Sequence, residues 1–308
     1  MIRRLKSDLV DADGKPLYAQ RKLQALAVPY TDEEREIHQK LNDYCASREK
    51  DAEKTGSTFG TSFVNQLLKK RLFSSPAAFA STLEKHVASL SNGVKPKARD
   101  AMAERILRKA ILKADEDYAN DQEVENAQSE AVEEASRRAQ PLNQEQQRML
   151  ADLRQWAQRA KNQTDAKARA ILDWLSANLK TGGQWNDRRV ILFTEYRTTH
   201  QWMHEILASH GFGGERLGLL HGGLTQDERE PIKAAFQASP KDSPVRILLA
   251  TDAASEGIDL QNHCNCLIHL EIPYNPNVME QRNGRIDRHG QREKEVLIWH
   301  PVDGSDKG

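Results

Sequence analysis

The chain is poor in cysteine and has no long hydrophobic run. Three cysteines among 308 residues cannot build a disulfide framework. Cys264 and Cys266 have no second cysteine pair with which to complete a zinc site, so no metal site is predicted. No apolar run approaches the roughly 18 residues that a membrane span requires, and the opening sequence MIRRLKSDLV lacks the hydrophobic region of a signal peptide. We therefore expect a cytoplasmic protein without a membrane partner.

An excess of charge of either sign is also missing. Lys and Arg number 45 and Asp and Glu number 45, so the formal net charge is zero. A strongly basic protein would indicate a polyanionic partner over its whole surface. Here any contact with nucleic acid must be local. The 38% of apolar residues is nevertheless enough for a folded core.

Residues 31–183 carry the apolar spacing of α-helices. Thr31 and Glu34 form the pattern of a capping box before the first of these helices. Residues 1–30 are basic and mixed, and they end in a short apolar run that predicts an extended segment. Residues 115–134 hold nine Asp or Glu and no Lys or Arg. This stretch predicts an acidic loop near 115–140 or an exposed helix face, with a decoy for basic partners as the alternative.

The periodicity changes after Gly183. Short runs rich in β-branched residues and leucine alternate with helical segments near 198–210, 225–238 and 277–289. The runs cover 189–194, 215–220, 245–251, 266–272 and 295–300. Strand, helix and strand in alternation predict a parallel sheet with crossover helices. In such a sheet, ligands bind outside the carboxyl ends of the strands.

Polar residues follow several of these predicted strands. Thr194 to Arg197 come after the first, Gly222 and Gly223 after the second, and Thr251 with the segment 255–259 after the third. The glycine pair precedes a predicted capping box at Thr225, so its backbone N–H groups could meet an anion at a helix start. A tight turn explains the glycines equally well.

The segment EQRNGRIDRHGQ at 280–291 is rich in arginine. Within a helix over 277–289, Arg282, Arg285 and Arg288 would project from one face at three-residue steps. Like charges on one face repel unless an anion lies opposite, and converging guanidinium groups suit a polyphosphate. Gly284 inside this helix predicts a close approach by another backbone.

Three blocks together resemble motifs IV, V and VI of superfamily-two helicases. They are VILFTEYR at 190–197, ILLATDAASEGIDLQ at 247–261 and EQRNGRIDRHGQ at 280–291. The likeness is greatest to the Swi/Snf-type DNA translocases of the RapA-like branch. Arg3, Arg4 and Lys6 resemble the stretch that leaves the first RecA-like lobe in that family. The resemblance is specific over 186–300, fair over 1–90 and weak between them.

The resemblance implies a fold and a division of the chain. Residues 184–308 are expected to form a RecA-like α/β lobe with a parallel sheet, the helicase C-terminal lobe. Residues 31–183 would be an all-α helical region or insertion, and residues 1–30 a linker from the missing first motor lobe.

The resemblance also implies roles for single residues. Arg285 and Arg288 would be arginine fingers for ATP hydrolysis, and Gln281 would lie at the interface between lobes. Gly257 and Asp259 would contact the nucleotide. The nucleic-acid backbone would be held by four residues, of which Arg197 is the least certain: Thr194, Arg197, Gly222 and Thr251.

The motifs that hold ATP and Mg²⁺ are absent. No G-x-x-x-x-G-K-[ST] sequence occurs, and no acidic pair follows an apolar strand in the manner of motif II. We therefore expect this chain to be one lobe of a larger ATP-dependent translocase on double-stranded DNA. ATP with Mg²⁺ would be bound mainly by the missing N-terminal lobe, and this chain alone would be inactive. The alternative is a non-catalytic module that binds nucleic acid or docks a partner.

Overall fold

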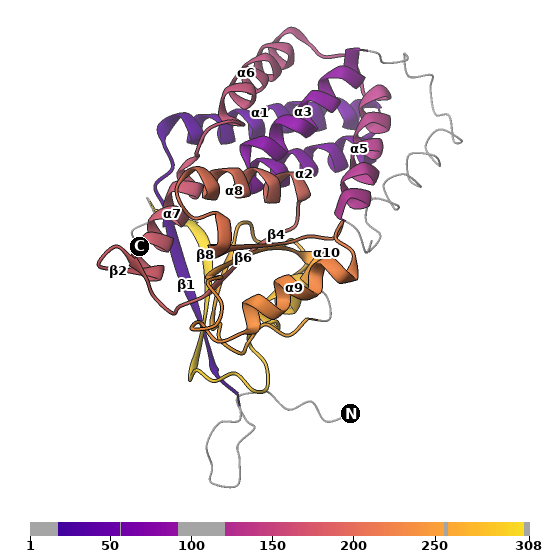
Figure 1. The fold of residues 1–308 in the computed structure, drawn as a ribbon. Helices are drawn as coiled ribbons and strands as arrows, with labels where there is room; N and C mark the ends of the chain where they lie inside the picture. Colours follow the sequence, from indigo (N-terminus) through magenta and orange to yellow (C-terminus); the bar gives the residue numbers. More distant parts are fainter. Residues whose placement is uncertain (1–17, 56, 92–120, 256–257, 305–308) are drawn as a thin grey trace. The chain divides into compact units, whose positions relative to one another are not determined.

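The computed structural model describes residues 18–55, 57–91, 121–255 and 258–304. These residues fold as two units (Figure 1). One unit contains the sheet and is built from described residues up to 29 and from 166 onward. The other is helical and spans residues 30–165.

The first unit is a six-stranded sheet in which every neighbouring pair is parallel. The strand order is β1-β8-β7-β4-β6-β5. The strands are β1 (Gln20–Val28), β4 (Val190–Thr194), β5 (Leu217–Leu220), β6 (Ile247–Thr251), β7 (Cys266–His269) and β8 (Glu295–Asp303). The predicted parallel sheet with crossover helices is confirmed.

The central strands are buried on both faces. Every residue of β4, β6 and β7 is buried, which is why their sequences are continuous apolar runs and do not alternate with polar residues. Helix α8 (Arg197–Ser209) packs against β4 and β6, α9 (Gln226–Gln237) against β5, and α7 (Ala166–Leu179) against β1. The Thr225–Glu228 capping box starts α9 as predicted.

Residues 20–28 belong to the sheet, although the sequence analysis placed them in a linker. Strand β1 pairs with β8 over its whole length, from Gln20 with Glu295 to Val28 with Asp303. As an edge strand it buries only Leu26 and Val28. Because so few of its residues are buried, the sequence predicted an extended segment here but not its pairing with β8.

Helix α7 also lies with the sheet unit, so the unit begins at residue 166 and not at 184. After α7 the chain turns back in a two-residue hairpin between β2 (Lys180–Thr181) and β3 (Gln184–Trp185). Gly182 and Gly183 have φ of +59° and +82° at this turn. Such values favour glycine, since a side chain would be strained there.

The helical unit is a bundle with its own core. Its helices are α1 (Asp32–Thr55), α2 (Thr58–Ser74), α3 (Pro76–Ser91), α5 (Asp121–Arg137) and α6 (Gln144–Ala160). Apolar residues from all five meet in one cluster, among them Tyr44, Leu68, Phe79 and Leu153. The Thr31–Glu34 box precedes α1 as predicted, because Glu34 accepts from the Thr31 backbone N–H at 2.7 Å.

The acidic loop predicted near 115–140 is corrected in part. Residues 121–137 form helix α5, which packs on α2 and α3 and buries Ala131 and Val132. Glu125 accepts from the buried Arg71 at 2.9 Å. The sequence did not indicate a packed helix here, because the apolar residues at helical spacing are small and are surrounded by many acidic residues. Residues 115–120 lie outside the described part of the chain.

No helix among the described residues is both long enough and apolar enough to cross a membrane.

One buried histidine of the helical unit yields a pH prediction. His86 lies between the Tyr44 hydroxyl and the Ser136 hydroxyl, at 2.7 Å from each. Burial, helped by the charge of Arg48, lowers the pKa of His86 to about 3. In the unfolded chain His86 takes up a proton near pH 6.5, whereas in the folded chain it stays neutral down to about pH 3. The free energy of unfolding therefore falls as the pH is lowered from 6.5 toward 3. Between pH 7 and 5.5 the wild type should lose on the order of 1.4 kcal/mol more than His86→Gln.

Urea denaturation followed by far-ultraviolet circular dichroism measures this difference. Other groups titrate equally in the two proteins, so comparing them isolates His86. Identical pH slopes would show that His86 does not carry the effect.

Candidate functional site

The carboxyl ends of β4, β6 and β7 lie at one edge of the sheet. Thr194 pairs in register with Thr251 at the ends of β4 and β6. Phe193 pairs with His269 at the end of β7, and Glu271 follows two residues later. Because the strands are parallel, these ends bring the three motif blocks to the same edge.

A buried arginine joins these strand ends. The Arg282 guanidinium donates to both Asp252 carboxylate oxygens, at 2.5 and 2.7 Å, and to Glu271 Oε1 at 3.3 Å. It also donates to the Glu271 carbonyl and to His269 Nδ1. Only 1% of the residue is exposed. Burial alone would lower the pKa of Arg282, but the carboxylates of Asp252 and Glu271 outweigh it and raise the pKa, so the guanidinium is charged.

Glu271 extends this network to β4. Its carboxylate accepts from the Thr194 hydroxyl at 3.0 Å and from the Glu195 backbone N–H at 2.5 Å. Arg282 and Glu271 together therefore tie the ends of β4, β6 and β7 to helix α11 (Pro276–Asn283).

The neighbouring histidine is held neutral. His269 Nε2 lies 3.0 Å from Asn283 Oδ1, while Nδ1 faces the Arg282 guanidinium, which can only donate. Burial and the charge of Arg282 lower the pKa of His269 to about 3. The Nε2–H tautomer satisfies both contacts.

The predicted helix over 277–289 is shorter in the structure. Helix α11 ends at Asn283, and the next backbone bonds run from Arg285 N to the Arg282 carbonyl and from Ile286 N to the Asn283 carbonyl. Arg282, Arg285 and Arg288 therefore do not share one helix face. The buried side chains of Arg282, Asn283 and Ile286 hold this segment against the sheet, which overrides the helical spacing.

Gly284 is also explained differently. A Cβ atom there would lie 3.2 Å from the Glu280 carbonyl oxygen of its own helix turn. The close approach is made by the preceding turn of the same segment and not by another backbone.

Arg285 and Arg288 both lie beside the segment that follows Gly257. The Leu260 backbone N–H donates to the Arg285 carbonyl at 3.1 Å. Arg288 forms an ion pair with Asp259 in which both side chains are exposed, 46% and 55%. The structure thus brings the backbone of Arg285 and the side chain of Arg288 to the segment that contains Asp259. Gly257 lies outside the described residues, and Gln281 is exposed on α11.

Strand β1 holds both ends of this arginine-rich segment. Arg21 donates to Glu280 at 2.7 Å and to Asp287 at 2.6 Å. Asp287 is buried and Glu280 is exposed. One side chain of the edge strand therefore contacts the motif on either side of Arg285.

The residues predicted to hold nucleic acid are placed unequally. Thr194 and Thr251 are fully buried, and the Thr194 hydroxyl is already bonded to Glu271. Arg197 donates to His200 Nδ1 at 3.0 Å. The Gly222 carbonyl accepts from Arg229 at 2.9 Å and closes the turn before α9. A nucleic-acid strand at this edge would therefore meet Arg197, which is partly exposed, whereas Thr194, Thr251 and Gly222 are buried in this structure.

Asp252 and Glu271 are site residues to which the sequence assigned no role: Asp252 was expected only as a polar residue after a strand, and Glu271 as part of the strand 266–272. Both stand at carboxyl ends of strands, where polar residues were expected, but neither belongs to a repeated spacing. The signal that could have found them is their position next to a buried strand. Among the described residues, no group of three or more His, Cys, Asp or Glu could hold a metal ion.

Comparison with known proteins agrees with this geometry. Residues 167–290 match the family described as helicase conserved C-terminal domain. The ATP-dependent helicase YqhH of Bacillus subtilis is 37% identical over 114 residues, which are 37% of this chain and 19% of that protein. The RNA polymerase-associated protein RapA of Yersinia enterocolitica is 30% identical over 135 residues, 44% of this chain and 13% of that protein. The chain thus spans only a small part of these relatives.

Solved structures show the same fold. The C-terminal part of the Fun30 ATPase domain matches with a TM-score of 0.50 and 16% identity, over 93% of this chain and 86% of that one. The Hef helicase domain of Pyrococcus furiosus matches with a TM-score of 0.53 and 13% identity, over 95% and 57%. Residues 167–290 are therefore similar to the helicase conserved C-terminal domain, and these matches confirm the resemblance of this chain to the C-terminal RecA-like lobe of Swi/Snf-type superfamily-two helicases of the RapA-like branch.

Proposed function

We propose that this chain is the second motor lobe of an ATP-dependent translocase on double-stranded DNA. The observation that carries the proposal is the position of Arg285 and Arg288 beside residues 258–260, at the carboxyl edge where β4, β6 and β7 end. Relatives named as an ATP-dependent helicase and as RapA support it.

The donors at this edge fit the phosphates of a nucleotide. Guanidinium groups donate in a fork that matches phosphate oxygens. ATP with Mg²⁺, bound mainly by the other lobe, would supply the phosphoryl group that is transferred. Arg285 and Arg288 would donate to that group as its negative charge develops. Gln281 would face the other lobe.

Arg288 is placed to change partners. Its ion pair with Asp259 is exposed on both sides, and such pairs contribute only about 0–1 kcal/mol. Exchanging the Asp259 carboxylate for a phosphate therefore costs little. Asp259, once released, would be able to accept from the ribose, with Gly257 beside it.

The double-stranded DNA would be held through its backbone. At this edge Arg197 and the backbone at Thr194, Gly222 and Thr251 would contact phosphates without reading the bases. Thr194 and Thr251 are buried as whole residues and Gly222 is buried as well, so these contacts require the edge to open when DNA binds. Closure of the two lobes around ATP would then move the bound strand.

The test compares ATP hydrolysis by the intact protein and by the 308-residue chain alone. We expect the intact protein to hydrolyse ATP faster when double-stranded DNA is added, because the two lobes must close to place the arginines. The isolated chain should not exceed the buffer rate, since the sequence has no phosphate-binding loop.

Single-stranded DNA and double-stranded RNA serve as controls for the polymer. A substantial rate from the isolated chain would contradict the division into two lobes. Binding of DNA by an intact protein that never hydrolyses ATP would instead favour the non-catalytic module.

A further inference from the structure

The opposite edge of the sheet contains a cavity of about 560 Å³. Its walls come from the segments that precede β4, β7 and β8 and from the end of α7, and they include Arg188, Arg189, Cys266 and Glu293. The amino ends of parallel strands lie at the edge away from the candidate functional site. Strand β4 has five residues, about 16 Å at ~3.3 Å per residue, and separates the two places.

Two residues of this wall hold buried N–H groups that lack a hydrogen-bond partner among the described residues. They are Arg189 Nη2 and Trp174 Nε1. Only 2% of Arg189 is exposed. A buried donor left without a partner costs about 1–3 kcal/mol, so it calls for an explanation. Both groups are donors, and a complementary ligand would offer acceptors.

Arg189 is also a buried cation with which no carboxylate of the described residues forms an ion pair. Its guanidinium donates to the Val245 carbonyl at 3.0 Å and to the Ala238 carbonyl at 2.5 Å, at the end of α9. Arg189 also donates to the Phe236 carbonyl, so it caps the C-terminal end of α9, but these neutral carbonyls do not balance its charge. Asp187 is nearby, but it pairs with Arg246 at 3.5 Å.

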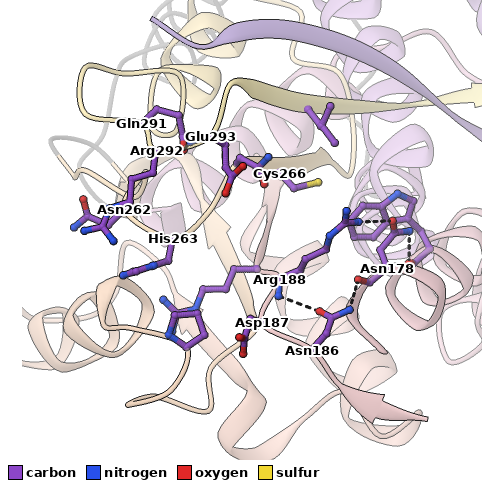
Figure 2. A pocket seen from close by; sticks show the side chains of 15 residues that line it. Asn178, Asn186, Asp187, Arg188, Asn262, His263, Cys266, Gln291, Arg292 and Glu293 are labelled. Carbon is purple, nitrogen blue, oxygen red and sulfur yellow. Dashed lines mark hydrogen bonds between the residues drawn. The ribbon is translucent and has the colours of Figure 1, made fainter. Parts of the chain in front are cut away.

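The remaining charges of the wall are mostly positive. Besides Asp187, the wall contains Arg188, Arg189 and Arg292 and one further carboxylate, that of Glu293, which forms no ion pair within the part of the chain that the structure describes. Arg292 makes no hydrogen bond among the described residues and is exposed. In Figure 2, Arg292 and His263 lie on one side of the cavity and Arg188 on the other. Burial together with the charges of Arg292 and Arg189 lowers the pKa of His263, in keeping with a positive potential there.

The excess of about two positive charges fits a dianion. A phosphate monoester carries about −1.5 to −2 at neutral pH and offers only acceptors on three oxygens. The cavity is larger than a phosphate ion and falls within the ~300–1,000 Å³ of ordinary small-molecule sites. The side-chain amides of Asn178, Asn186 and Gln291 lie in the same wall, but each already forms hydrogen bonds within the chain, so the donors that remain for a ligand are those of the arginines and of Trp174.

We propose that this cavity binds a small phosphate monoester through Arg189, Arg292 and Trp174. The site is distinct from the nucleotide site and does not depend on the proposed motor activity. Substituting Arg189 would also remove the cap of α9, so the informative variants are Arg292→Ala and Trp174→Phe. The second removes the indole N–H group and keeps an aromatic ring at this position.

Isothermal titration calorimetry with inorganic phosphate and with ribose 5-phosphate tests the proposal. Neither probe contains a base. Wild type should bind at least one of them saturably. Arg292→Ala should weaken that binding about tenfold and Trp174→Phe about fivefold, as expected for a lost charged and a lost neutral hydrogen bond.

Matched controls are available for each variant. Arg159→Ala removes an exposed arginine of the helical unit that pairs with Glu33, and Trp299→Phe changes the ring that packs against Trp174 at 5.6 Å but does not line the cavity. Arg288→Ala removes an arginine of the nucleotide site. All three should bind within about twofold of wild type.

A second readout is the ring resonance of His263 in nuclear magnetic resonance spectra, which should shift on titration with the bound probe. Tighter binding of ribose 5-phosphate would identify an organic ester, and equal binding would identify the phosphate group itself as the ligand. Absence of saturable binding up to about 10 mM, or equal affinity in wild type, Arg292→Ala and Trp174→Phe, would overturn the proposal.

Discussion

Replacing Arg285 by alanine is expected to lower the DNA-stimulated ATP turnover of the intact protein by about 10³-fold or more, the usual effect of losing an arginine finger. The backbone at this position should not move, because its contact with Leu260 uses the Arg285 carbonyl and not the side chain. The loss should therefore appear in kcat, with folding unchanged. Arg288→Ala should act in the same direction.

Two further variants separate charge from geometry. Arg285→Lys keeps a positive charge but loses the planar fork, so we expect only partial recovery. Arg159→Ala is the matched control, since Arg159 is an exposed arginine of the helical unit, paired with Glu33. It should leave turnover unchanged. Near-normal turnover in Arg285→Ala, with normal melting, would remove Arg285 from the mechanism.

The largest effect on stability is expected at Arg282. Arg282→Met would leave the carboxylates of Asp252 and Glu271 without their cation at the ends of three strands. Breaking a buried ion pair from one side costs about 3–5 kcal/mol. Urea denaturation should show this as a lower midpoint with the same slope. Arg288→Ala breaks only an exposed pair and should cost under about 1 kcal/mol.

A double variant identifies the cause of that loss. In the double variant Arg282→Met with Asp252→Asn, one of the two carboxylates that lost their cation is removed. The loss in free energy of unfolding should therefore be smaller than the sum of the losses of the two single variants. A strictly additive result, or a loss below about 1 kcal/mol for Arg282→Met alone, would show that the network does not stabilise the sheet edge.

Arg282 also shows why the arginine-rich segment was read differently in the sequence. Three-residue steps predict a shared helix face, and nothing local contradicts this. The contacts that end α11 at Asn283 come from residues distant in the chain: Asp252 lies 30 positions before Arg282, and His269 lies 14 before Asn283. The same applies to Arg21, which reaches Asp287 across 266 positions.

The local sequence pattern was sufficient to predict features that depend on a single helix start or a single strand. The capping boxes at Thr31 and Thr225 and the apolar runs of β4, β6 and β7 depend on neighbours within a few residues. The residues of α5 are the opposite case, because the alanines of that acidic helix are buried only once α2 and α3 supply the other side.

The amino-acid sequence by itself determined that a parallel sheet follows the helical region and that Arg285 and Arg288 belong to its carboxyl edge, since periodicity and motif order act over short distances. Only the tertiary structure decided that β1 completes the sheet, that Arg282 is a buried strut between Asp252 and Glu271, and that Arg189 and Trp174 share a cavity at the other edge. These features depend on contacts between residues far apart in the chain. Local sequence spacing does not reveal such contacts, because they form only when the sheet brings the residues together.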